Sequence, residues 1–136
     1  MRKILLFALL LLTPVLGHAQ ADLGTLRAKF VKIMAIPTGG KVACKDADMS
    51  QALAAQGVSL DPNAQVAWAT TPAEVKAYAA DKRIVLVPKV ELLSNGASLA
   101  LIEEGGKMVF YLHYQNLQAT GKTLADTVLR VAKRYQ

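Results

Sequence analysis

The chain has 136 residues, of which 53% are hydrophobic and 19% are charged. This composition is that of a globular protein, and it excludes a disordered chain, a collagen and a coiled coil. The length suits one domain and leaves no room for a second. Sixteen Lys and Arg against ten Asp and Glu give a net charge of +6. The basic residues form no clustered stripe, so we expect no nucleic-acid partner.

Residues 1–21 have the three parts of a secretory signal peptide. Arg2 and Lys3 precede an apolar run over residues 4–12, and small residues then allow cleavage after Ala19 or Ala21. A membrane anchor is the less favoured alternative, because a spanning helix needs roughly 20 apolar residues. The sequence therefore predicts a periplasmic domain of residues 22–136 that does not insert into the membrane. Without Arg2 and Lys3, 14 basic residues face ten acidic ones, a net charge of +4.

Cys44 is the only cysteine, so no intramolecular disulfide can form. Oxidising compartments favour paired cysteines, and burial alone must therefore hold this exported fold together. Cys44 ends the apolar run Val42-Ala43-Cys44, which favours a small buried side chain. An exposed thiol would instead allow a disulfide-linked homodimer.

The first half of the chain alternates predicted helices and strands. Residues 23–34 carry apolar side chains at helical spacing, and Pro37 ends that helix. The apolar stripe of this helix consists of Leu23, Leu26, Phe30, Ile33 and Met34. A strand over residues 41–44 follows, and then a helix from Asp46 or Asp48 to Gln56.

A second strand over residues 66–69 leads to the strongest helix start in the sequence. In Thr71-Pro72-Ala73-Glu74, the Thr hydroxyl caps the helix, Pro fits the first turn, and Glu74 reaches back to the cap amide. Residues 83–88 form a β-branched run, as expected for a strand that is covered on both faces. Three strands with helices between them imply parallel pairing.

The pattern changes in the second half. Residues 99–103 and 107–113 flank Gly105-Gly106, which suits a tight hairpin turn. Thr123-Leu124-Ala125-Asp126 predicts a last helix, whose apolar stripe consists of Leu124, Val128, Val131 and Tyr135. The fold class that we predict is a single α/β domain. Its mixed sheet has about five strands, three parallel strands plus an antiparallel hairpin, with helices on its faces.

The sequence offers no set of catalytic or metal-binding residues. His18 leaves with the signal peptide, and nothing in the spacing pairs the remaining His113 with Cys44 as a nucleophile and its base. One Cys and one His cannot build a zinc site, and neither a phosphate loop nor a dinucleotide-binding fingerprint is found. We therefore expect neither an enzyme, nor a metal, nor a cofactor.

One generic ligand site remains, at the carboxyl ends of the parallel strands. Lys45, Thr71 and Lys89 follow the three strands, and two lysines beside a helix N-terminus suit a small anion. The alternative is that Thr71 only caps its helix and the lysines only solvate the rim.

The C-terminal third, from Ala97 to Arg134, resembles the closing segment of the YfiR-like family of exported bacterial proteins. The shared pattern is an apolar strand, a Gly-rich turn, a strand centred on Phe, a Gly-containing turn, and a helix with alternating basic and apolar residues. The residues that match the family pattern are Phe110, Gly121, Leu129, Arg130 and Ala132. The order of strands and helices in the rest of residues 22–136 is similar too.

The resemblance implies a periplasmic, non-enzymatic regulator of cyclic di-GMP signalling and biofilm formation. Such a regulator binds the periplasmic part of an inner-membrane diguanylate cyclase and holds the cyclase inactive. Tyr111, Tyr114 and Tyr135 are the candidate anchors for the partner protein, because interfaces favour aromatic residues; each also suits a position in the core. The alternative function is a small periplasmic ligand-binding module that uses Lys45, Thr71 and Lys89.

Overall fold

The structure, a computed structural model, describes residues 23–135, so the predicted signal peptide lies outside the described residues. Residues 23–35 form the N-terminal helix. The elements that follow are η1 (Ile36–Thr38), β1 (Lys41–Cys44), α2 (Ala47–Ala55), β2 (Ser59–Leu60), β3 (Val66–Trp68), α3 (Pro72–Ala80), β4 (Ile84–Val87), η2 (Val90–Asn95), β5 (Leu99–Glu104), β6 (Lys107–Leu112), α4 (Tyr114–Thr120), α5 (Asp126–Val131) and β7 (Lys133–Arg134).

The strands form one mixed sheet in the order β2-β1-β3-β4-β5-β6-β7. Neighbouring strands are parallel throughout, except for the antiparallel hairpin of β5 and β6. The predicted fold class, a single α/β domain with a mixed sheet, is confirmed, but the sheet has seven strands rather than about five. The two additional strands, β2 and β7, lie at the edges and have two residues each. Two residues are too few to show the period-two alternation that reveals a strand in a sequence.

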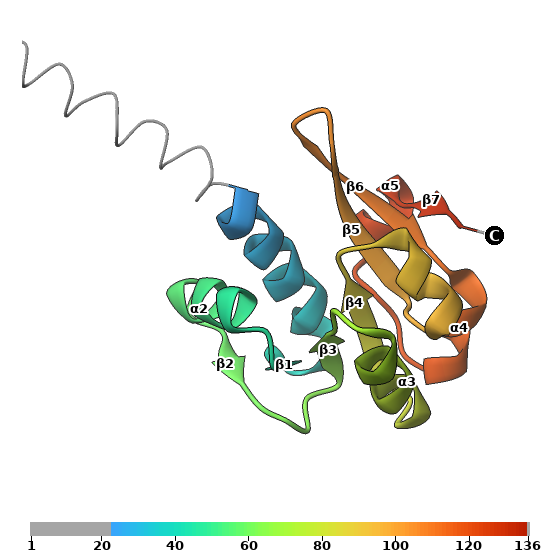
Figure 1. The fold of residues 1–136 in the computed structure, drawn as a ribbon, viewed down its shortest axis with the longest axis horizontal. Coiled ribbons are helices and arrows are strands. Elements are labelled where there is room, and N and C mark those ends of the chain that lie inside the picture. Colours follow the sequence, from blue (N-terminus) through green and yellow to red (C-terminus); the bar gives the residue numbers. More distant parts are fainter. Residues whose placement is uncertain (1–22, 136) are drawn as a thin grey trace, which may run out of the picture.

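Helices cover both faces of this sheet (Figure 1). The N-terminal helix, α2 and α5 pack with β-strand side chains into one hydrophobic core, which includes Met34, Leu53 and Val128. On the opposite face, α3 and η2 pack against a second core. The strand side chains in this second core are mostly small, among them Ala43 and Ala67. Every residue of β4 is buried, as predicted for a strand that is covered on both faces, and every residue of β3 is buried too.

The start of α3 has the predicted cap, with one difference. Thr71 Oγ1 accepts a hydrogen bond from the backbone N–H of Glu74 at 3.2 Å, and Pro72 occupies the first turn. The Glu74 carboxylate, however, accepts from the backbone N–H of Thr70 at 3.1 Å, one residue before the cap. The Thr70 hydroxyl donates to the same oxygen, which explains why Glu74 reaches that far.

The N-terminal helix buries only part of the predicted apolar stripe, since Met34 is fully buried and Phe30 packs partly buried against the core. Ala28, Val31 and Met34 are fully buried, whereas the exposed fractions of Leu23 and Ile33 are 41% and 39%. Small side chains such as Ala28 allow a helix to lie close to a sheet, so the buried face is not the face with the largest apolar residues.

The C-terminal segment also departs from the prediction. The last helix, α5, ends at Val131, which is 64% exposed. The chain then pairs with β6 as β7, and Tyr135 N donates to Leu112 O at 2.9 Å.

The predicted capping box at Thr123 is wrong, because Ala125 occupies the N-cap position and the Thr123 hydroxyl donates to Leu124 O. Residues 114–120, which the sequence left in a turn, form α4.

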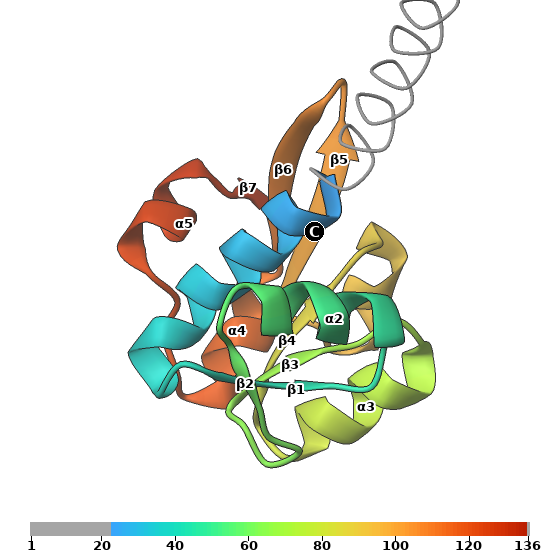
Figure 2. The ribbon, with the colours of Figure 1, turned by 90° about the vertical axis from the view of Figure 1, so that its left-hand side faces the viewer.

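The hairpin of β5 and β6 extends beyond the helices that pack on the sheet, as two perpendicular views show (Figures 1 and 2). Gly105 and Gly106 at its tip have φ angles of 57° and 80°. Two consecutive positive φ angles are those of the type I′ turn that the Gly-Gly pair predicts.

Candidate functional site

The three tyrosines predicted as partner anchors lie close together at the β6–β7 edge of the sheet. Tyr111 is on β6, Tyr114 begins α4 immediately after that strand, and Tyr135 directly follows β7. The pairing of β6 with β7 brings the third tyrosine to the first two, because it places Tyr111 opposite Lys133. A helix through Tyr135, which the sequence analysis predicted, would not have made this juxtaposition.

Two cations lie over two of these rings. Lys133 Nζ is 5.9 Å from the ring centroid of Tyr111, and Arg134 Cζ is 5.4 Å from that of Tyr114. Both distances lie within the range of cation–π attraction. We call Tyr111, Tyr114, Tyr135, Lys133 and Arg134 the tyrosine surface.

A pocket of about 380 Å³ opens within the tyrosine surface. Its lining residues are Leu112, His113, Tyr114, Gln115, Arg134 and Tyr135. His113 Nδ1 accepts from the backbone N–H of Asn116 at 3.2 Å and so caps α4. His113 directly follows β6, so it joins the hairpin strand to this helix.

The tyrosines differ in how far they are available to a partner. Tyr114 is 47% exposed, whereas Tyr111 and Tyr135 are half-buried and pack against the second core. The Tyr111 hydroxyl donates to Glu104 Oε2 at 2.7 Å, and this bond to a carboxylate raises the pKa of Tyr111. The alternative of a core position is therefore partly right for Tyr111 and Tyr135, and Tyr114 is the most exposed ring.

The ligand rim predicted at the carboxyl ends of the strands does not form one pocket. Thr71 is exposed and its hydroxyl accepts the cap hydrogen bond of α3. Lys45 lines a separate pocket of about 350 Å³ beside Tyr78 and Arg83, and neither Thr71 nor Lys89 lines that pocket. Thr71 thus acts as a cap, which the sequence analysis gave as the alternative.

Cys44 lies at the carboxyl end of β1 and is half-buried rather than fully buried. Its thiol donates to Asp46 O at 3.4 Å. Burial raises the pKa of the Cys44 thiol, and the bond from Ser50 opposes that shift.

Among residues 23–135, no group of three or more His, Cys, Asp or Glu is placed to hold a metal ion.

Sequence reasoning missed the contact between the half-buried Arg27 and the buried Trp68. Trp68 ends β3 and is only 2% exposed, and Arg27 Cζ lies 6.0 Å from its ring centroid. The buried N–H groups at Arg27 Nε and Trp68 Nε1 find no acceptor among the described residues. Arg27 does not belong to the apolar stripe that the sequence predicts, so that stripe gave no indication of this contact. A tryptophan at the end of a buried strand was the available signal.

The fold is shared with solved structures that have very different sequences. Over 83% of this chain and 60% of the other, it superposes on a conserved domain protein from Vibrio cholerae O1 biovar El Tor, with a TM-score of 0.62 and 11% identity. An ABC domain in complex with L-Trp from Streptococcus pneumonia gives a TM-score of 0.57 and 10% identity over 82% of this chain and 59% of the other. The chain thus spans about three-fifths of each structure. No family model and no curated protein matches the sequence.

Fold and site together define a small α/β domain with a mostly parallel sheet. An aromatic, basic surface lies at the β6–β7 edge of this sheet. Within the described part of the chain, no helix combines the length and the apolar character needed to cross a membrane.

Proposed function

We propose that this protein is a periplasmic, non-enzymatic regulator that binds the periplasmic part of an inner-membrane diguanylate cyclase and represses it. The tyrosine surface is the contact, and repression lowers cyclic di-GMP and restrains biofilm formation. The observation that supports this most is the gathering of the three tyrosines at one edge of the sheet. Tyr114 and Tyr135 line one pocket there, and Lys133 and Arg134 lie over the rings of Tyr111 and Tyr114. The resemblance of residues 97–134 to the YfiR-like family supports the identity of the partner.

The chemistry of this surface suits a protein partner. Tyr and Arg are enriched among the residues that dominate binding energy in protein interfaces, because they bury a large area and also form hydrogen bonds. Tyr114 and Arg134 are both exposed, so a partner can reach them without unfolding the sheet.

Repression by such a surface requires no reaction. A regulator that prefers the inactive state of the cyclase shifts its population by the ratio of the two affinities. A preference of about 5.5 kcal/mol moves the equilibrium from 1:99 to 99:1. The protein needs only to discriminate between two conformations of its partner.

Calorimetric titration of the purified protein against the purified periplasmic domain of the cyclase tests the proposal. We expect Tyr114→Ala and Arg134→Ala each to weaken binding by tenfold or more, as for a residue that carries about 1.4 kcal/mol or more of the binding energy. Because both side chains are exposed, thermal unfolding of the variants should match that of the parent.

Lys45→Ala and Lys89→Ala are the matched controls, since they also remove an exposed side chain but lie outside the tyrosine surface. We expect both controls to bind like the parent. A folded parent protein that shows no binding to the cyclase domain would overturn the proposal. Loss of binding in the two lysine variants alone would move the contact to the strand ends.

A further inference from the structure

The helix α4 begins with an unusual cap, because its N-cap residue is a histidine. His113 Nδ1 accepts a hydrogen bond from the backbone N–H of Asn116 at 3.2 Å. The amide of the third residue of a helix has no partner within the helix, so the imidazole supplies the bond that this amide needs. The usual capping residues, Ser, Thr, Asp and Asn, keep their protonation state near neutral pH, whereas imidazole does not.

The cap bond determines which nitrogen of His113 carries a proton. A ring nitrogen that accepts a hydrogen bond has no proton, so the proton of the neutral ring is on Nε2. Protonation of the ring adds a proton to Nδ1, and both nitrogens are then donors. The protonated ring therefore cannot accept from Asn116 N, and α4 loses its cap. The positive charge would also face the positive end of the helix dipole.

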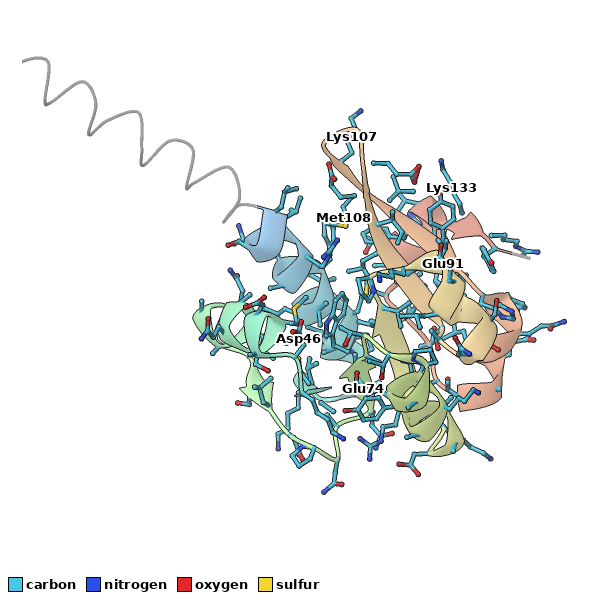
Figure 3. The ribbon with its side chains drawn as sticks, in the orientation of Figure 1. Asp46, Glu74, Glu91, Lys107, Met108 and Lys133 are labelled. Carbon is cyan, nitrogen blue, oxygen red and sulfur yellow. The ribbon has the colours of Figure 1, made fainter. Side chains whose placement is uncertain are left out.

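The groups that surround the imidazole offer no carboxylate to hold a protonated ring in place. The charged or titratable side chains that line the pocket with His113 are Tyr114, Arg134 and Tyr135, none of which is acidic. The ring of Tyr135 lies 6.5 Å from that of His113. β5 approaches through the neutral backbone, since Ser98 O accepts from His113 N. Glu91 on η2 is exposed and does not line this pocket (Figure 3).

The cap orders the segment that carries the most exposed tyrosine. Tyr114 directly follows His113 and is the first residue of α4. The side chain of Asn116 donates to Leu93 O at 2.8 Å and to Ala97 O at 2.9 Å. The first turn of α4 is thus held by Asn116, whose backbone N–H binds His113. Loss of the cap removes one of the bonds that fix this turn, and with it the position of Tyr114.

We propose that His113 is a pH-sensitive cap. The neutral imidazole orders the start of α4 and the tyrosine surface, whereas the protonated imidazole loosens both and weakens binding of the partner protein. The effect on the partner rests on the proposed function, but the loss of the cap does not. Imidazole ordinarily takes up a proton near about pH 6.5, so the cap is complete above that pH and is lost as the pH falls. Acidification therefore releases the partner.

The test compares the parent with His113→Asn and His113→Ala. Asn caps a helix well and does not titrate in this range, whereas Ala provides no cap at any pH. The readout is the hydrogen exchange of the Asn116 amide, measured by nuclear magnetic resonance on the intact domain and divided by the exchange rate of an unstructured peptide at the same pH. This ratio gives the protection of the one amide that the cap binds.

We expect the protection of the Asn116 amide in the parent to fall by about fivefold or more between about pH 7.5 and about pH 5, the factor that corresponds to the loss of one cap. His113→Asn should keep its protection at both values, and His113→Ala should lack it at both. The amides of the buried strand β4 show that each protein stays folded. The same pH profile in the parent and in His113→Asn would overturn the inference. So would a neutral ring with its proton on Nδ1, which the ring ¹⁵N shifts distinguish.

Calorimetric titration against the periplasmic domain of the cyclase tests the effect on the partner. A partner that binds only the ordered surface loses affinity in proportion to the fraction of molecules that are ordered. We expect the affinity of the parent to fall by about threefold or more relative to that of His113→Asn over the same pH range. Any titration of the cyclase domain itself affects both proteins equally.

Failure of this inference and failure of the proposed function give different results. If the parent and His113→Asn bind the cyclase domain with the same pH dependence, the regulator function stands and the control of binding by His113 is wrong. If neither protein binds the cyclase domain but the Asn116 amide of the parent responds to pH, the pH-sensitive cap stands and the regulator function is wrong.

Discussion

Gly96 ends η2 with a φ angle of 122°, and a Cβ at this position would lie 3.0 Å from the Cβ of Ala79 on α3. Both the backbone conformation and the space therefore require glycine. Gly24 on the N-terminal helix is the opposite case, because a Cβ there would have no neighbour within 4 Å. The two glycines allow a matched test of what the absence of a side chain contributes.

We expect Gly96→Ala to lower the free energy of unfolding by about 1–3 kcal/mol, through strain at a positive φ angle and contact with α3. We expect Gly24→Ala to leave it unchanged or to raise it by up to about 1 kcal/mol, because alanine favours a helix. Urea unfolding of both variants measures the two changes. Stability losses of the same size would contradict the placement of Gly96 against α3.

The half-buried thiol of Cys44 makes stability depend on pH at alkaline values. Burial raises the pKa of Cys44 in the folded protein above its value in the unfolded chain. The protonated thiol is therefore the form that folding favours. Its stabilising contribution is complete below the ordinary thiol pKa of about 8.5 and is lost as the pH rises through the folded pKa.

We expect the free energy of unfolding of the parent to fall between about pH 7 and about pH 9.5 more than that of Cys44→Ala, which has no thiol. Urea unfolding of both proteins across this range measures the difference. Tyr78, whose pKa burial also raises, is present in both proteins. A parallel decline of the two curves would show that the thiol is solvated in the folded state.

At the scale of elements, the cap of α3 is the feature for which the sequence is most informative. The Thr71 hydroxyl accepts from Glu74 N, and Thr70 adds two bonds to the Glu74 carboxylate. We expect Thr71→Ala to lower the free energy of unfolding by about 1 kcal/mol and Thr71→Ser, which keeps a hydroxyl, to change it by much less. Chemical denaturation of the two variants checks this. An equal loss in both would mean that the methyl group, and not the cap, is responsible.

The sequence predicted those elements whose signals are local. All five predicted strands are present, because residues 41–44, 66–69 and 83–88 are apolar runs and Gly105-Gly106 fits only a tight turn. What it could not predict depends on distant partners. β7 forms because Lys133 and Arg134 pair with the end of β6. Nothing within residues 126–135 indicates that this pairing occurs.

In the candidate site, too, the sequence predicts the local features and misses those that depend on distant partners. Tyr111, Tyr114 and Tyr135 were selected by residue type alone, and the pairing of β6 with β7 then brings them to one surface. The strand-end rim was inferred from chain order, which places Lys45, Thr71 and Lys89 at one edge of the sheet but does not bring their side chains into one pocket. The direction of a side chain and the distance between strand ends depend on contacts between distant segments. A single stretch of sequence therefore does not predict them.

At the scale of the whole molecule, burial is unevenly distributed. β3 and β4 are buried on both faces, whereas Glu103, Glu104 and Lys107 near the hairpin tip are exposed. Regions with few buried contacts open locally, while central strands exchange their amide protons only when the whole domain unfolds.

We expect the amides of β3 and β4 to exchange at rates set by the global free energy of unfolding, and the amides of residues 104–107 to exchange many times faster. Native-state hydrogen exchange with increasing denaturant measures both. Tip amides that are as slow as those of β4 would show that the hairpin unfolds only with the sheet.

The Gly-Gly tip has a practical consequence for following this protein in living cells. A Cβ added at Gly105 or Gly106 would meet no atom within 4 Å, and the tip projects away from both cores (Figure 2). Exposed loop tips of this kind tolerate inserted sequence. A short epitope or dye-labelling peptide between the two glycines would therefore leave both chain ends native and place a reporter at the outer end of the hairpin.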